Sequence, residues 1–408
     1  MGVALFGVIK NFHVLAGSIL KVGADTVIIN QAAKATDSPI LQKELLASIF
    51  KLLLLQVIAI FFAMIFLEEV IYKIVFSSVL PESFSWIIQV ILALVLSTIF
   101  AEMIANFFNG LLDLRKVFIS SLSGSFLTMT LALILKPTSY LVLSFLALSS
   151  GFFSALILGF FLIKTFPASW LMQFKDNRGF FSNFPISITL SIVPLLVASA
   201  FLVIQNLITS AYGLEALATF ILCGTLISAM LTLIMSSARM YFLPKLGALK
   251  NPQERNSFFQ MNVYFFLSAT SIVLIFVMLF AENIISILYS DEFLAASGLL
   301  VLRSSTMILM AFLWVVTISA WEKNRFILYM IPEVIRETLY VITCFGCIYN
   351  GLSLDKVFLG FICSEVISSF FWVGYLNFYK SELRINPLLL TMIYLITFLL
   401  IYFTYNLL

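Results

Sequence analysis

Apolar runs of about 20 residues or more recur along the whole chain, separated by short polar segments. An α-helix needs a run of this length to cross the hydrocarbon core of a bilayer. We therefore predict an all-α polytopic membrane protein with about twelve transmembrane helices. The runs are 6–31, 45–67, 84–109, 117–135, 140–163, 186–207, 214–239, 257–280, 296–320, 326–349, 357–375 and 387–408.

Composition supports the same class of protein. The 408 residues are 62% hydrophobic and 11% charged, with a mean hydropathy of +1.11. A soluble domain of this size could not bury so much apolar surface. The polar segments are too short to hold a soluble catalytic domain. The net charge of +3 is spread along the chain, and we expect no nucleic-acid partner.

The longest polar segment, residues 164–185, alternates aromatic and basic side chains such as Trp170, Lys175 and Arg178. A segment of this kind is expected to lie along the membrane surface. Because this segment divides the predicted helices into two groups, we expect an N-terminal lobe of five helices at 1–163 and a C-terminal lobe of six helices at 186–380. Residues 164–185 would be the cytoplasmic linker between the lobes, and 381–408 an extra C-terminal transmembrane helix.

Lys and Arg residues fall mainly on alternate polar segments, which predicts the orientation. The basic set would be cytoplasmic, and Met1 would then lie outside. The start lacks a basic region and a cleavage site, so we expect no cleavable signal peptide. The sparse side carries Lys73, Lys136 and Lys356.

The first apolar run carries charge on one stripe. Lys10 and Lys21 are eleven residues apart, which at about 100° per residue returns to nearly the same helix face. Asp25 follows one turn later, and Gly17 lies on the same stripe. Such a stripe faces a wet cavity or a charged partner, because lysine in lipid is costly. The alternative is that Lys21 and Asp25 simply neutralise each other, although Lys10 has no obvious partner in its own helix.

Further polar residues lie inside other predicted helices. Glu102, Asn106 and Asn109 follow one another at helical spacing, which indicates either a wall of a transport pathway or a polar seam between helices. The second lobe repeats the pattern at Arg303, Glu333, Arg336, Glu337 and Glu365. The basic turns at Arg115, Lys116, Lys323 and Arg325 occupy equivalent places in the two lobes, as cytoplasmic gates or as ordinary positive-inside anchors.

This mixed set of charges fits transport better than catalysis. Buried carboxylates can carry protons, and buried Lys or Arg can bind phosphate oxygens. The single histidine, His13, leaves no catalytic triad and no metal-ligand cluster. Cys344 and Cys347 have a C-x-x-C spacing but no second pair, which favours buried thiols over a metal or redox site. We therefore expect no catalytic residues, no metal and no cofactor.

Several short motifs resemble the bacterial flippases that carry O-antigen and enterobacterial common antigen lipid intermediates, of the multidrug, oligosaccharidyl-lipid and polysaccharide (MOP) exporter superfamily. The resemblance covers the chain from Phe6 to about Tyr379. Its motifs are Leu15-Ala16-Gly17 through Asp25 to Asp37-Ser38-Pro39, Tyr241-Phe242-Leu243-Pro244-Lys245-Leu246, Leu288-Tyr289-Ser290 with Phe293, and Arg325-Phe326 followed by Glu333.

The resemblance implies a MATE-like fold of two lobes that rock around a central cavity in the bacterial inner membrane. Its cargo would be an undecaprenyl-pyrophosphate-linked oligosaccharide, and a polymerase and a chain-length regulator of the same pathway would be possible partners. By position, the cavity residues for the cargo are Lys10, Lys21, Asp25, Glu102, Asn106 and Arg303, and the cavity or coupling residues are Glu333, Arg336 and Glu365.

Two departures from the family stand out. The family's first helix has no counterpart here, which would explain the predicted outside position of Met1. A Gly-Asp pair common in the family's tenth helix is replaced by Ser305-Thr306, so a proton-coupling role of that aspartate does not transfer. The alternatives are a cation or drug antiporter, a peptidoglycan-precursor flippase and, from another class, an O-antigen polymerase.

Overall fold

Helices make up all the regular structure that the computed structural model describes. It describes residues 2–21, 24–76, 86–137, 139–166, 184–237, 242, 245–246, 249, 251–322, 326–378 and 387–407. Eight of its helices are long and apolar enough to cross a membrane, or nine if one bent pair counts as a single span. The predicted all-α polytopic membrane fold is confirmed, while fewer than twelve spans meet this criterion within the described ranges.

The chain divides into two compact units, Met1–Asn206 and Leu207–Leu408. The division falls within α11 (Phe184–Ser237). A few residues further along this element, Gly213 interrupts the helical backbone with a φ of 84° and a ψ of 179°. Glycine tolerates this left-handed φ without steric cost. The predicted linker lies mostly at 167–183, outside the described residues, so the lobe boundaries at 163 and 186 stay a prediction.

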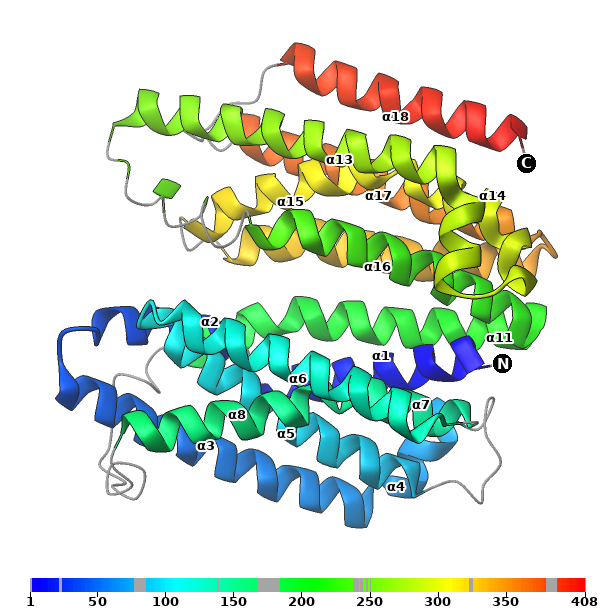
Figure 1. Ribbon diagram of the computed structural model, residues 1–408. Coiled ribbons are helices and arrows are strands. Elements are labelled where there is room, and N and C mark those ends of the chain that lie inside the picture. The colour runs from blue at the N-terminus through cyan, green and yellow to red at the C-terminus, as the bar shows by residue number, and fades with distance from the viewer. Residues whose placement is uncertain are drawn as a thin grey trace. The chain divides into compact units, whose positions relative to one another are not determined.

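Unit 1 is organised around α5, which contacts α1, α2, α3, α6 and α8 (Figure 1). Helix α5 is apolar on most sides, and half of its residues are buried. Gly110 at its end allows close packing on α2, since an added Cβ would lie 2.5 Å from the Ile29 carbonyl oxygen. The elements are α1 (Gly2–Lys21), α2 (Ala24–Lys34), α3 (Pro39–Phe66), α4 (Glu68–Ile71), the π-helix η1 (Tyr72–Phe76), α5 (Ile87–Gly110), α6 (Leu114–Leu135), α7 (Tyr140–Leu148) and α8 (Ser150–Thr165).

The outer helices of unit 1 expose large apolar side chains. Phe61 and Phe62 on α3 and Phe126 and Leu133 on α6 are more than half exposed. Helices of a membrane bundle present such side chains to lipid. The interior of the unit therefore lies along α5, which is where polar side chains can be shielded from the bilayer.

Unit 2 packs around α15, which contacts α13, α16, α17 and α18 (Figure 1). Phe312 and Trp372 are fully buried in its core. The last helix belongs to this packing, because Ile393 joins the core and the Tyr394 hydroxyl lies 2.6 Å from Ser369 Oγ. The elements are α13 (Pro252–Leu288), the 3-10 helix η4 (Asp291–Ala296), α14 (Ser297–Ser304), α15 (Met307–Glu322), α16 (Phe326–Tyr349), α17 (Leu354–Phe378) and α18 (Pro387–Leu407).

The run 6–31 corresponds to α1 and α2, which are described up to Lys21 and from Ala24. A different predicted helix is divided. The run 296–320 corresponds to α14 and α15, which meet at a bend of 45°. At this bend the hydroxyls of Ser304, Ser305 and Thr306 each donate to the carbonyl three residues earlier, at 2.8, 2.7 and 3.0 Å. Hydroxyls that bind the backbone locally compete with regular helical hydrogen bonds, and this explains the bend.

Candidate functional site

The polar stripes of α1, α2 and α5 meet inside unit 1. Lys21, the last residue of α1, forms an ion pair and hydrogen bond with Glu102 of α5. Asp25 in the first turn of α2 lies 4.0 Å from the Lys21 ammonium, and Asn106 donates to its Oδ1 at 2.8 Å. The structure therefore brings together four predicted site residues, which we call the Lys21 site: Lys21, Asp25, Glu102 and Asn106.

The Lys21 site is only partly covered. The side chains of Lys21, Asp25 and Glu102 are 21%, 33% and 42% exposed. The lysine stem lies above Gly17, where an added Cβ would be 3.7 Å from Lys21 Cε. A ligand can reach a lysine with this exposure. Gly17 of α1 leaves room for the Lys21 side chain.

The partner of Lys21 differs from the pair suggested by spacing within one helix. Glu102 of α5 makes the short contact, whereas Asp25 is at the limit of an ion pair and is oriented by Asn106. Helical periodicity gives neighbours on one helix but not the residue that a second helix places opposite them. The structure therefore contains the predicted Lys21–Asp25 ion pair at its distance limit, together with a closer pair between Lys21 and Glu102.

Sequence reasoning missed Gln56. This buried residue of α3 donates through Nε2 to the carbonyl oxygen of Leu20 at 2.8 Å, next to the end of α1. This hydrogen bond joins α3 to the last described turn of α1. The available signal was Gln56 itself, the one polar residue in the stretch 52–66 of α3. Lys10 also lies on α1, partly buried, and no ion pair or hydrogen bond joins it to another described residue.

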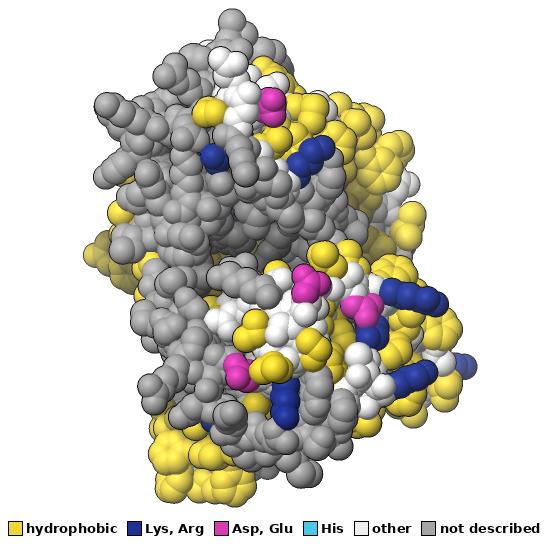
Figure 2. Space-filling model, turned by 90° about the vertical axis from the view of Figure 1, so that its left-hand side faces the viewer, with side chains coloured by type: hydrophobic (Ala, Val, Ile, Leu, Met, Phe, Trp, Pro, Cys, Tyr) yellow, Lys and Arg dark blue, Asp and Glu magenta, His cyan; other side chains and the backbone are white. Residues whose placement is uncertain are grey.

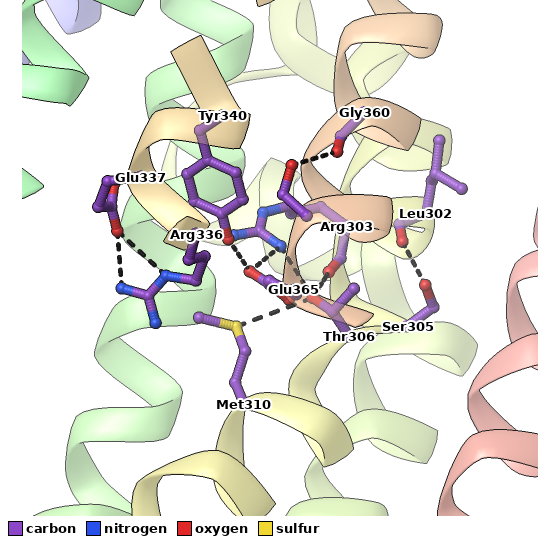
Figure 3. Close-up of polar contacts among 11 residues, drawn as sticks. Leu302, Arg303, Ser305, Thr306, Met310, Arg336, Glu337, Tyr340, Gly360 and Glu365 are labelled. Atoms are coloured by element: carbon purple, nitrogen blue, oxygen red, sulfur yellow. Dashed lines mark hydrogen bonds and ion pairs between the residues drawn. The ribbon is translucent and has the colours of Figure 1, made fainter. Parts of the chain in front are cut away.

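A second polar cluster lies in unit 2 and is almost sealed. Arg303 of α14 lies 2.9 Å from Glu365 Oε1 of α17, and its Nη1 donates to Thr306 Oγ1 at 2.8 Å. Tyr340 of α16 donates its hydroxyl to the same Glu365 oxygen (Figure 3). The Arg303 and Glu365 side chains are 10% and 0% exposed. Arg303 is thus held across the bend between α14 and α15, and a ligand cannot reach it without a rearrangement.

Arg336 extends this cluster along α16. Its guanidinium lies 2.7 Å from both Glu333 Oε2 and Glu337 Oε1, and 5.9 Å from the centre of the Tyr340 ring. Figure 3 shows Tyr340 between the Arg336 pair and the Arg303 pair. Sequence reasoning missed Tyr340, because a tyrosine in a membrane helix is unremarkable until its hydroxyl has a known partner.

Carboxylates outnumber cations in this unit 2 cluster. Three glutamates share two guanidinium groups, and Glu337 Oε2 and Glu365 Oε2 are buried without a hydrogen-bond partner in the described structure. A buried unpaired carboxylate charge is costly. The sealed cluster therefore contains one more carboxylate than guanidinium groups, while direct ligand contact is better suited to the more exposed Lys21 site.

The four predicted gate residues have different positions. Lys116 lies 2.8 Å from Asp113 and donates to Thr165 Oγ1 at 2.9 Å, so it joins the start of α6 to the end of α8. Arg115 is exposed, and Lys323 and Arg325 lie outside the described residues. Figure 2 looks onto the end of unit 1 where α3 begins and α8 ends, and shows basic and acidic side chains gathered there among apolar ones.

Two other expectations concern metals and thiols. Within the described ranges, no group of three His, Cys, Asp or Glu side chains is arranged to hold a metal ion. Cys344 is buried, Cys347 is partly buried, and neither is in a disulfide.

Comparison with known proteins identifies the fold. Neither a family model nor a curated protein matches the sequence. Among solved structures, an outward-facing multidrug resistance MATE family transporter of the MOP superfamily matches with a TM-score of 0.71 and 15% identity, covering 94% of this chain and 88% of that chain. An inward-facing one matches with a TM-score of 0.70 and 18% identity, covering 92% and 89%.

A third similar structure is a MOP superfamily transporter from Pyrococcus furiosus, for which reverse polarity of the binding pocket suggests a different function. Its TM-score is 0.68 at 16% identity, covering 94% of this chain and 87% of that chain. The MATE-like fold is therefore confirmed for this chain.

Proposed function

We propose that this protein is a transporter of the bacterial inner membrane that moves an undecaprenyl-pyrophosphate-linked oligosaccharide between leaflets by alternating access. The observation that carries the proposal is a partly exposed lysine, Lys21, where α1, α2 and α5 meet inside unit 1. The fold supports transport, since similar transporters have been solved in outward-facing and inward-facing conformations.

The Lys21 site suits the head of such a cargo. An ammonium group binds phosphate oxygens as a compact charge with three donors. Asn106 and Asp25 add polar groups that can bind sugar hydroxyls, and the apolar outer faces of α3 and α6 suit a prenyl tail. Because Arg303 is sealed by Glu365, we assign it to the support of the bend in unit 2 rather than to direct cargo contact.

The unit 2 cluster is proposed to couple transport to a proton. Its excess of one carboxylate over the guanidinium groups, with two buried carboxylate oxygens that have no hydrogen-bond partner among the described residues, supports a coupling role for Glu333 and Glu365, with Arg336 as the permanent positive charge that pairs with Glu333. A proton on one glutamate would release its arginine partner and thereby bias the bend between α14 and α15.

A cation or drug antiporter is the second candidate. It is favoured by the two carboxylates, Asp25 and Glu102, that accompany a single lysine in unit 1. Multidrug resistance transporters among the similar structures agree with it. A peptidoglycan-precursor flippase would share the anionic cargo, whereas an O-antigen polymerase would be an enzyme and has no support from the fold.

Complementation tests the proposal. The chain is expressed in cells that lack their own O-unit flippase, and surface polysaccharide is assayed on a lipopolysaccharide gel. Restored long-chain polysaccharide supports the flippase. Drug resistance without restored polysaccharide, at equal protein level, supports the antiporter instead.

A further inference from the structure

The Lys21 ammonium is already occupied by an internal anion, Glu102. Any anionic ligand must therefore compete with this carboxylate. The inference that follows rests on the proposed binding of an anionic head group at Lys21.

The two carboxylates near Lys21 are held differently. Asp25 accepts a hydrogen bond from Asn106 at 2.8 Å, which fixes it independently of the lysine. Glu102 accepts no hydrogen bond from a described residue other than Lys21. Its side chain is also the more exposed of the two. Glu102 can therefore leave the ammonium and be solvated, while Asp25 stays in place.

The ion pair between Arg303 and Glu365 in unit 2 is an example of a carboxylate that is fixed in place. Glu365 is fully buried and accepts hydrogen bonds from both Arg303 and Tyr340. Displacing it would leave a carboxylate without solvent and a guanidinium without a partner, which is strongly unfavourable. Glu102 has neither constraint, so exchange is confined to the Lys21 site.

We infer that Glu102 is an exchangeable internal counter-ion, and that a phosphate or pyrophosphate group binds by taking its place on the Lys21 ammonium. A phosphate group carries more charge and more acceptor oxygens than one carboxylate, so it can win this competition. When the ligand leaves, Glu102 returns and neutralises the lysine. The competition between Glu102 and the ligand sets both the affinity and the release of the ligand. A substitution that weakens the Glu102–Lys21 contact should therefore strengthen ligand binding and slow transport.

Binding to the purified full-length protein in detergent tests the inference, with inorganic pyrophosphate and farnesyl pyrophosphate as probes in titration calorimetry. Glu102→Gln is expected to bind both at least about ten-fold more tightly than wild type, which corresponds to about 1.4 kcal/mol. Lys21→Met is expected to abolish binding in either background. Glu69→Gln removes the glutamate of an exposed Lys–Glu pair at 2.8 Å and is the matched control, with unchanged affinity.

The outcomes separate the two proposals. If Lys21→Met abolishes binding but Glu102→Gln binds no more tightly than wild type, the inference that Glu102 is an exchangeable counter-ion is wrong, and the proposed head-group site at Lys21 is supported. If Lys21→Met binds as wild type does, the head-group site itself is wrong. Tighter binding of the farnesyl probe indicates a lipid-borne anion, and equal binding of both probes indicates a free one. If Glu102→Gln does not fold, Glu102→Asp is tested in its place. Its shorter side chain should weaken the contact with Lys21 and give a smaller gain in ligand affinity. If Glu102→Asp gives no gain in affinity, the inference is overturned.

Discussion

Lys21 and Arg303 occupy matching positions in the two units. Each lies in the last turn of a helix, α1 or α14, and each forms an ion pair with a glutamate of a neighbouring helix in its own unit. The pairs differ in exposure, since the Lys21 and Glu102 side chains are 21% and 42% exposed and those of Arg303 and Glu365 are 10% and 0% exposed. This difference is the reason that our proposal places ligand contact at Lys21 and not at Arg303.

Replacing Arg303 with methionine should strongly destabilise unit 2, because the fully buried Glu365 loses its cation. The expected loss is about 3–5 kcal/mol in the free energy of unfolding. Thermal unfolding in detergent measures it. Lys73→Met, which removes the cation of an exposed pair, should cost at most about 1 kcal/mol. Equal small losses for both variants would contradict the sealed position of Arg303.

Tyr340→Phe should remove one hydrogen bond from Glu365 without changing the packing of the ring. The expected cost is about 1–3 kcal/mol, since a buried charged acceptor loses a donor. Tyr349→Phe is the matched control, because Tyr349 of the same helix is exposed. A destabilisation that is equal in the two variants would remove Tyr340 from the cluster.

Gly124→Ala should destabilise the packing of α6 against α8. An added Cβ would lie 2.9 Å from the Ser150 carbonyl oxygen and 3.0 Å from the Ser154 backbone nitrogen, so backbone must move. Overpacking of this kind costs about 1–3 kcal/mol. Gly346→Ala in α16, where nothing lies within 4 Å of the new Cβ, should be neutral or slightly stabilising. Thermal unfolding of both variants checks the sign of each effect.

How far the sequence predicts this protein depends on the kind of contact. Apolar runs indicate the spans, and helical periodicity places Lys21 with Asp25 and Glu102 with Asn106 on single faces. Periodicity within one helix does not show that Glu102 faces Lys21, because that depends on how α5 packs against α1. The bend at Ser305 and Thr306 was not predicted either, since serine and threonine also occur in straight helices.

Gln56 and Tyr340 show the same limit of prediction from the sequence. Each is an uncharged residue whose importance comes from a partner distant in sequence, Leu20 for Gln56 and Glu365 for Tyr340. The charged residues were easier to predict, because a charge within a membrane span is costly wherever its helix packs.

The most direct test of the central claim is translocation by the purified protein in proteoliposomes. The cargo is a fluorescent prenyl-pyrophosphate-linked saccharide, and its arrival in the other leaflet is measured with a membrane-impermeant glycosidase. Wild type and the Lys73→Met control should translocate it, Lys21→Arg should retain part of the rate, and Lys21→Met should reduce it at least about ten-fold, equivalent to about 1.4 kcal/mol. Translocation by Lys21→Met at the wild-type rate, or none by folded wild-type protein, would contradict the account.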